Sequence, residues 1–229
     1  MIKKTTSRSE PKIATRKQPK KLAFRRYTNL AATIHLLRKK QITLLNPASW
    51  DDKNDAYFMA EYKRIAGAKT VLAICFAEAD ETYHHWRVFS NGSDGVCIEF
   101  NRSPLISKFE SCRNIRTGKV EYHLIKTLQK KTGLQADKLP FLKRRPYRDE
   151  CEYRAVYVDK NEDLPFKDIQ IELTWIKRIT LSPWMSSSLR DSVTETLRSI
   201  PSCSGLKIAK STLVSNSDWQ ALTSNVKRK

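Results

Sequence analysis

Apolar positions along the chain recur at two spacings, which predict two kinds of element. Leu30, Ile34 and Leu37 repeat at the spacing of a helix face. Asn29 precedes them as a favoured N-cap residue, so we expect a helix that runs to about Arg38. The same reasoning predicts a helix that follows the polar turn 50–55 and ends near 65, and helices over 80–89 and 188–199. Short runs rich in β-branched and aromatic residues predict strands over 22–27, 42–45, 71–76, 96–100, 151–158, 176–181 and 206–208.

These strands and helices do not alternate strictly, as they would in a series of βαβ units. Their order favours an α+β fold, with a mixed or antiparallel sheet and flanking helices. We expect a single folded domain over residues 22–220, a disordered basic arm over 1–21 and a flexible basic tail over 221–229.

The hydropathy of the chain gives no sign of a membrane or of export. The longest unbroken apolar run, Val71 to Ala77, is far too short to cross a membrane. The opening residues lack the apolar core of a signal peptide. We therefore expect a cytoplasmic protein that does not associate with membranes.

Positive charge is concentrated in two stretches. The 229 residues include 43 Lys and Arg against 24 Asp and Glu, a formal net charge of +19. Residues 1–26 and residues 113–148 each contribute +9, so the rest of the chain is nearly neutral. Such stretches can neutralise phosphates and release counterions, which gives affinity without sequence readout. We therefore expect a nucleic acid or another polyanion as a partner; a solubilising tail, or a surface that steers a phosphate-bearing small molecule, is the alternative.

Several common sites are excluded by residue spacing. The six glycines form neither the dinucleotide-binding nor the phosphate-loop fingerprint. The five cysteines include no CxxC pair, so we predict reduced thiols and no metal site. His84 and His85 are adjacent and cannot both face one metal well, so one should pack and the other should face solvent. The acidic turn 51–55 fails the calcium-loop pattern, and helix capping is the more common use of such residues.

The sharpest cluster of charged residues is the segment 148–154, RDECEYR. Because side chains alternate along a strand, a single strand here would place four charged residues on one face: Arg148, Glu150, Glu152 and Arg154. Cys151 and Tyr153 would then point the other way, into the core. Two carboxylates this close can divide acid and base work in a pocket. The alternative is a solvent-facing ladder of paired charges on an exposed sheet face.

Motifs spread over most of the chain carry a family resemblance. In order they are FRRYTNL, LLNPASWDDKND, AICFAEADETYHHW, GVCIEF, ECEYRAVY and IKRITLSPWM, and they span about residues 22 to 220. This set resembles a widespread bacterial family that is catalogued as domain of unknown function number 2971. The family carries no established activity, so the resemblance implies kinship rather than a reaction.

The opening FRRYTNL, followed by a helix and the strand ITLL, also resembles the start of ADP-ribosyltransferase-like domains. That resemblance implies that NAD is bound and split at its nicotinamide–ribose bond. It implies that Arg26, or less readily Arg25, holds NAD, and that Tyr27 stacks on the nicotinamide. Glu152 would be the catalytic carboxylate that stabilises the oxocarbenium-like transition state, and Glu150 would activate the acceptor.

Two functions are consistent with these patterns. The first is an NAD-using ADP-ribosyltransferase-like enzyme that acts on a nucleic acid or protein acceptor, a chemistry that would suit a toxin or antiphage effector. The second is a non-catalytic module whose basic surfaces bind nucleic acid, with Glu150 and Glu152 serving structure alone.

Overall fold

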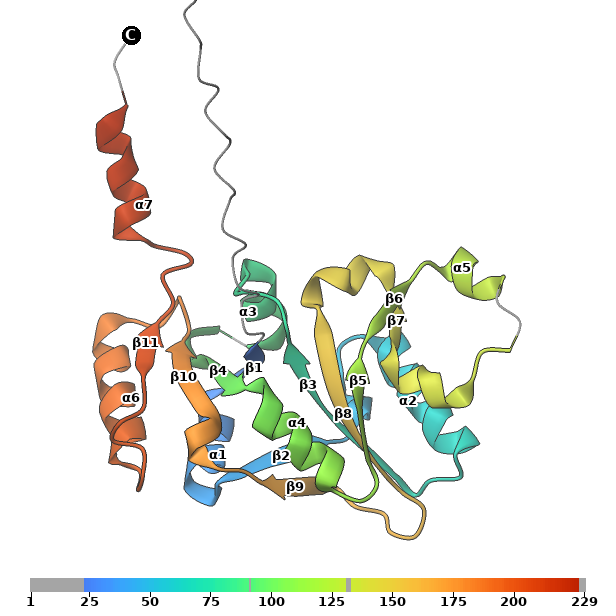
Figure 1. Ribbon diagram of the computed structural model, residues 1–229. Coiled ribbons are helices and arrows are strands. Elements are labelled where there is room, and N and C mark those ends of the chain that lie inside the picture. Colours follow the sequence, from blue (N-terminus) through green and yellow to red (C-terminus); the bar gives the residue numbers. More distant parts are fainter. Residues whose placement is uncertain (1–22, 91, 131–132, 227–229) are drawn as a thin grey trace, which may run out of the picture.

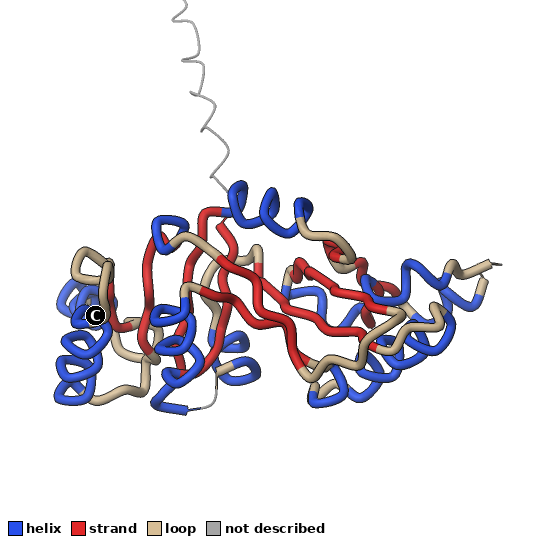
Figure 2. Tube along the Cα trace, turned by 90° about the horizontal axis from the view of Figure 1, so that it is seen from below, coloured by secondary structure: helices blue, strands red, loops and turns tan. Residues whose placement is uncertain are grey.

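The computed structural model describes residues 23–90, 92–130 and 133–226. The predicted basic arm over 1–21 and the last part of the predicted tail over 221–229 lie outside the described residues. Strands form the middle of the molecule and helices lie around them (Figures 1 and 2). None of the described helices has the length and apolar character needed to cross a bilayer.

A nine-stranded sheet organises the fold. Seven strands follow one path in the order β11-β10-β4-β1-β3-β2-β9, and β8 pairs with both β3 and β5 beside this path. The pairing of β10 with β11 is parallel, and the other pairings in this sheet are antiparallel. The predicted α+β class with a mixed sheet is therefore confirmed. The strands are β1 (Ala23–Asn29), β2 (Gln41–Leu45), β3 (Thr70–Ala77), β4 (Gly95–Asn101), β5 (Ile115–Lys119), β8 (Glu152–Asp159), β9 (Phe166–Gln170), β10 (Ile176–Leu181) and β11 (Ile208–Lys210).

A second, two-stranded parallel sheet joins β6 (Glu121–His123) to β7 (Leu142–Arg144). The α-helices are α1 (Leu30–Lys39), α2 (Lys53–Ile65), α3 (Tyr83–Phe89), α4 (Arg102–Ser111), α5 (Ile125–Gln129), α6 (Ser187–Ser199) and α7 (Ser217–Ala221). Short 3-10 helices are η1 (Pro47–Ser49), η2 (Gly92–Asp94), η3 (Ala136–Phe141), η4 (Arg145–Glu150), η5 (Leu173–Trp175) and η6 (Leu222–Asn225). Helix α7 extends away from the body of the molecule (Figure 1).

Strand β3 is buried on both faces, which explains its continuous apolar sequence. Leu72, Ile74 and Phe76 point into the main core, where α1 and α4 also pack. Val71 and Ala73 point to the opposite side and pack against α2. The alternation of side chains along the strand thus supplies two separate cores from one segment.

The sheet is interrupted along one edge of β3. Strand β1 pairs with β4 along its whole length but meets β3 at a single position, Arg25 opposite Ala77. Strand β2 meets the same edge of β3 at a single position, Leu45 opposite Ala73. Between these two positions β1 and β2 diverge, so the middle of β3 faces an opening instead of a neighbouring strand.

The prediction for segment 148–154 is wrong in its first half. Arg148 and Glu150 lie in η4, and Cys151 has a left-handed backbone with φ 44° and an exposed side chain. The strand begins only at Glu152. Glu152 and Arg154 do share a strand face, and Tyr153 points into the core as predicted.

Candidate active site

A cavity of about 500 Å³ lies in the opening beside β3. All five residues that the sequence singled out line it: Arg25, Arg26, Tyr27, Glu150 and Glu152. Three of them come from β1, and the two glutamates come from η4 and the start of β8, more than a hundred residues later in the chain. The volume lies within the usual range for small-molecule sites, which is about 300–1,000 Å³.

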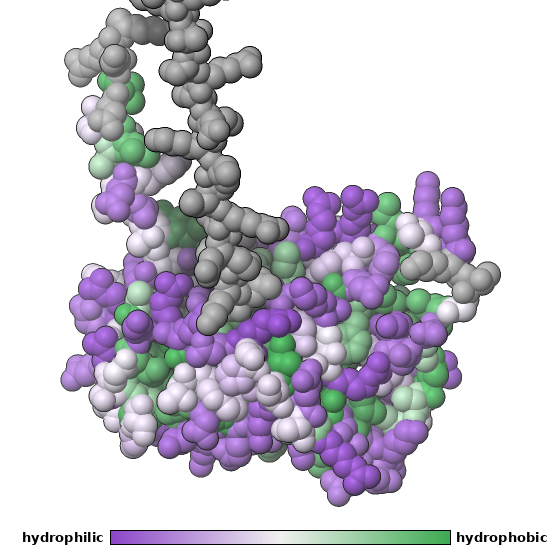
Figure 3. Space-filling model, viewed as in Figure 1, coloured by the Kyte–Doolittle hydropathy of each residue, from purple (hydrophilic) through white to green (hydrophobic). Residues whose placement is uncertain are grey.

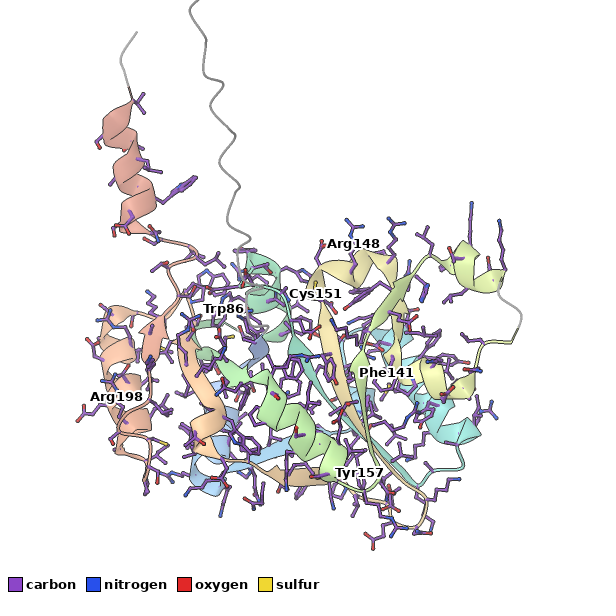
Figure 4. The ribbon with its side chains drawn as sticks, viewed as in Figure 1. Trp86, Phe141, Arg148, Cys151, Tyr157 and Arg198 are labelled. Atoms are coloured by element: carbon purple, nitrogen blue, oxygen red, sulfur yellow. The ribbon has the colours of Figure 1, made fainter. Side chains whose placement is uncertain are left out.

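A buried cluster of charged side chains from several elements lies at this cavity, and all its members except Arg154 line the cavity. Its members are Asp55 on α2, Lys143 on β7, Glu150 on η4, and Glu152 and Arg154 on β8. Figure 4 shows the side chains of these elements on the ribbon, with Arg148 on the outer side of η4. Glu150 is 2% exposed and Arg154 is fully buried, which rules out the solvent-facing ladder.

Arg154 uses every one of its N–H donors inside the cluster. It donates to both carboxylate oxygens of Glu152, at 2.8 and 2.9 Å, and to both carboxylate oxygens of Asp55. Its remaining donor binds the carbonyl oxygen of Pro140 at 2.9 Å. The Trp50 ring covers the guanidinium, with 4.8 Å between the guanidinium carbon and the ring centre. A fully buried charge is tolerated when all its donors are paired in this way.

Lys143 is the second cation of the cluster. Its Nζ lies 2.5 Å from Glu150 Oε2, 3.4 Å from Glu152 Oε2 and 3.6 Å from an Asp55 oxygen. Burial acts to lower the pKa of Lys143, but the neighbouring carboxylates outweigh it and raise the pKa. Lys143 therefore remains an ammonium group at neutral pH and ties the two glutamates together.

The two glutamates differ in protonation. Burial acts to raise the pKa of Glu152, but Arg154 and then Lys143 outweigh it and lower the pKa to about 2. Burial raises the pKa of Glu150 to about 7, against the opposing effect of Lys143. At neutral pH Glu152 is thus a fixed anion, whereas Glu150 exchanges its proton. Titratable pairs whose surroundings separate their pKa values in this way are characteristic of acid–base sites.

Arg26 and Arg25 alternate on β1 and have different surroundings. Arg25 donates to the carbonyl oxygen of Ala79 at 2.5 Å and forms ion pairs with Asp80 and Glu99 at 3.1 and 3.4 Å. Arg26 forms no hydrogen bond or ion pair with the described residues, and burial lowers its pKa. Arg25 is thus held by β4 and by the segment after β3, whereas Arg26 is a cation in the cavity wall with no partner in the described part of the chain.

Arg26 also lines a second cavity, of about 430 Å³, on the side of α1 and β9. Leu45 is the other residue that both cavities share. The walls of the second cavity are largely apolar, with polar groups from His35, Gln41, Thr43 and Asp168. The two cavities therefore adjoin at Arg26.

The ring of Tyr27 is held by α3. It stacks on His85 with 5.2 Å between ring centres and meets Trp86 edge to face. The hydroxyl is buried and has no hydrogen-bond partner among the described residues; burial, and then the nearby Cys97 thiol, raise its pKa. One face of Tyr27 is therefore already occupied, and stacking on a nicotinamide, which stays a prediction, would have to use the rest of the ring.

The adjacent histidines behave as predicted, since His85 is fully buried and His84 is exposed. The capping role is also confirmed for Asp52, whose side chain accepts the Asn54 and Asp55 amides at the start of α2. Asp55 itself is instead buried against Arg154. Sequence reasoning missed Asp55 and Lys143 as site residues, because each lies in a run of similar charges that gives no sign of which member is buried.

Comparisons with known proteins give a weak structural likeness. No family model matches the chain, and no curated protein matches it in sequence. The fold is similar to that of Thermus sp. 2.9 DarT in complex with NAD+, with 11% identity and a TM-score of 0.45 over 88% of this chain and 98% of that chain. Two further structures are Thermus sp. 2.9 DarT in complex with carba-NAD+ (10% identity, TM-score 0.44, 88% and 99% covered) and with ADP-ribosylated ssDNA (11% identity, TM-score 0.46, 89% and 98% covered). Likeness at this level does not assign an activity, so the functional argument depends on the cavity itself.

Proposed function

We propose that the chain is an ADP-ribosyltransferase-like enzyme that uses NAD as substrate. The observation that carries the proposal is the convergence of Arg26, Glu150 and Glu152, from distant segments, on one cavity. The two glutamates are near neighbours in the chain, but nothing in the spacing of Arg26, on β1, required it to meet them.

The two adjoining cavities suit an extended ligand with a charged centre. Arg26 lines both and has no partner among the described residues, so a pyrophosphate placed there would receive charge-assisted hydrogen bonds. The nicotinamide riboside would then occupy the cavity that contains the glutamates, and the adenosine would occupy the cavity beside α1. This arrangement supports the cofactor-binding role that the resemblance implied for Arg26, in preference to Arg25.

The glutamates suit the two halves of a transfer reaction. When the nicotinamide–ribose bond breaks, its electron pair leaves with the nicotinamide and cancels the ring's positive charge. The ribose then carries the developing positive charge, and the fixed anion of Glu152 would stabilise it. Glu150, whose pKa is raised to about 7, would accept the proton of the attacking acceptor group. The bond from the acceptor to the ribose completes the transfer.

A nucleic acid is the acceptor that the surface near the cavity favours. Arg144, Arg145 and Arg148 are exposed on η4 and beside it, in sequence between the cavity-lining residues Lys143 and Glu150. Arg144 and Arg145 form no ion pair with the described residues, and Arg148 pairs with its neighbour Asp149 at 3.5 Å. The surface over η4 is largely hydrophilic (purple in Figure 3). Exposed arginines in a segment that also supplies cavity-lining residues are well suited to phosphate groups.

The test is nicotinamide release from NAD by the purified protein, with mass spectrometry of the protein and of added single-stranded DNA or RNA. The Glu152→Gln variant keeps the side-chain shape, removes the charge and should abolish release. The matched control is Glu195→Gln, an exposed residue of α6 far from the cavity, which should retain full activity. If no release occurs under any condition while salt-sensitive nucleic-acid binding persists, the chain is the non-catalytic binding module.

A further inference from the structure

Helix α3 contacts Glu150 through two consecutive histidines. His85 Nε2 lies 3.3 Å from the carbonyl oxygen of Glu150, and its Nδ1 lies 2.6 Å from Thr82 Oγ1. A carbonyl only accepts, so Nε2 carries the proton and Nδ1 accepts from the threonine hydroxyl. Burial lowers the pKa of His85 as well. His85 is therefore a neutral, fixed tautomer that anchors the backbone of Glu150 and does not exchange protons with its side chain.

His84 contacts the carboxylate of Glu150 instead. Its Nε2 lies 3.9 Å from Glu150 Oε1, and its side chain is 50% exposed. The other oxygen, Oε2, is bound by Lys143, whereas Oε1 accepts no hydrogen bond from the described residues. Oε1 is thus the reactive oxygen of Glu150, and it faces a side chain that also reaches solvent.

The other charged and titratable groups around Glu150 cannot accept its proton. Lys143 on β7 and Arg154 on β8 are already protonated cations. Glu152 is held as an anion by Arg154, and Asp55 on α2 is bound by the same guanidinium. The Tyr122 hydroxyl on β6 accepts the Glu152 amide, and burial raises its pKa. Among the described residues, His84 is the group that is both near Oε1 and open to water.

We propose that Glu150 and His84 form a proton-transfer pair that connects the cavity to solvent. In this role His84 acts through Glu150 and is a positioning residue. The source of the proton depends on the proposed function. Glu150 Oε1 takes the proton of the acceptor group as that group bonds to the ribose. The proton then passes to His84 Nε2, and the resulting imidazolium releases a proton from Nδ1 to water. Glu150 returns to its carboxylate form for the next turnover.

The first test measures the pair without any substrate. Glutamate is labelled with ¹³C at the side-chain carboxyl, and the Glu150 signal, assigned by its loss in Glu150→Gln, is followed by NMR across a pH titration. His84→Gln removes the imidazole that faces Glu150 Oε1 and should shift the titration midpoint of Glu150 by about half a pH unit or more, because the surroundings of that carboxylate change. The matched control is His123→Gln, which removes another histidine beside a glutamate, Glu121, at 3.2 Å and outside the cavity. An unchanged Glu150 midpoint in His84→Gln would overturn the proposal.

The second test uses turnover. His84→Ala should lower kcat by about tenfold or more, with the Michaelis constant for NAD nearly unchanged, since His84 acts on proton transfer and not on binding. Added imidazole should restore part of kcat in His84→Ala and have no effect on His123→Ala. Absence of rescue would contradict the relay even if kcat falls.

The two tests separate the inference from the proposed function. If the titration midpoint of Glu150 shifts but the protein never consumes NAD, the result supports the Glu150–His84 pair and contradicts the proposed transferase activity. NAD consumption with an unshifted midpoint would retain the transferase and reject the pair. His84 is half exposed, so its variants should fold; His84→Asn is a second substitution for the NMR titration if His84→Gln does not.

Discussion

Arg154 on β8 donates hydrogen bonds to both carboxylate oxygens of Asp55 on α2, a residue 99 positions earlier in the chain. This pair joins the sheet to the helix that covers it, beneath the cavity. Asp55→Ala would leave part of a fully buried guanidinium unpaired, which costs about 3–5 kcal/mol. We expect the free energy of unfolding in urea to fall by about that amount. The control Asp191→Ala removes an exposed pair with Arg190 and should leave the urea midpoint nearly unchanged; equal effects of the two variants would refute a stabilising role for the buried pair.

The pKa of Glu150 predicts how stability depends on pH. Its folded value, about 7, lies above the ordinary 4.5, so its contribution is fully present below pH 4.5 and is lost as the pH rises through 7. Over this interval the contribution falls by about 3.5 kcal/mol at most, since one pKa unit corresponds to about 1.4 kcal/mol. Urea unfolding at several pH values, compared between the native chain and Glu150→Gln, isolates this contribution. A constant difference between the two from pH 4.5 to pH 8 would show that the pKa of Glu150 is not raised.

Arg26 and Arg25 should give opposite results when each is changed to Gln. Arg26 is desolvated and unpaired among the described residues, so Arg26→Gln should keep or slightly raise stability. The same change should weaken NAD binding by about tenfold to a hundredfold, the usual value of a hydrogen bond to a charged group. Arg25→Gln should lower stability, because it removes bonds to Ala79, Asp80 and Glu99. Thermal unfolding and calorimetric NAD titration of both variants check this; stronger loss of NAD affinity in Arg25→Gln would reverse the assignment.

The two basic stretches should contribute separately to nucleic-acid binding. Each phosphate contact removed should reduce the slope of log affinity against log salt by about 0.7 for a single strand. Deletion of residues 1–21 and replacement of Arg144, Arg145 and Arg148 by Ser should each flatten that slope, and their effects should add. Fluorescence anisotropy with single-stranded DNA at several salt concentrations measures it. A slope that neither change alters would exclude both surfaces from the interface.

Local patterns predicted most of the fold. Asn29 caps α1, the apolar run gave β3, and alternate positions gave β8 within one residue of its observed start. Helix α4 was not predicted because only two of its residues, Leu105 and Phe109, are buried, which gives no clear helical repeat of apolar positions. Strand β9 was not predicted from the sequence because it is an edge strand with a single buried residue, Ile169. These elements depend on neighbours that the local sequence does not specify.

The site was predictable in its residues more than in its geometry. Spacing indicated that Glu152 and Arg154 share a face, which the structure confirms. It placed Glu150 on the same strand, where the left-handed Cys151 instead turns the chain. That turn lets Glu150 approach Lys143 from a separate element. A periodic pattern of apolar positions does not predict a single residue with a left-handed backbone, such as Cys151. The local sequence also does not indicate that Lys143, among the basic residues beside it, is the one that lies in the site.

Strands β1 and β2 each pair with β3 at a single position, which affects how the parts of the sheet can move relative to one another. The part of the sheet that carries Arg26 meets β3 through one pair of residues, and β2 meets the same edge through another. Glu152 lies on the far side, on β8, which is paired with β3 along its full length. The two walls of the cavity thus belong to bodies that few backbone hydrogen bonds clamp together. A ligand that contacts both Arg26 and Glu152 would connect these two bodies. Ligand binding would therefore reduce their relative motion and make the whole sheet more rigid.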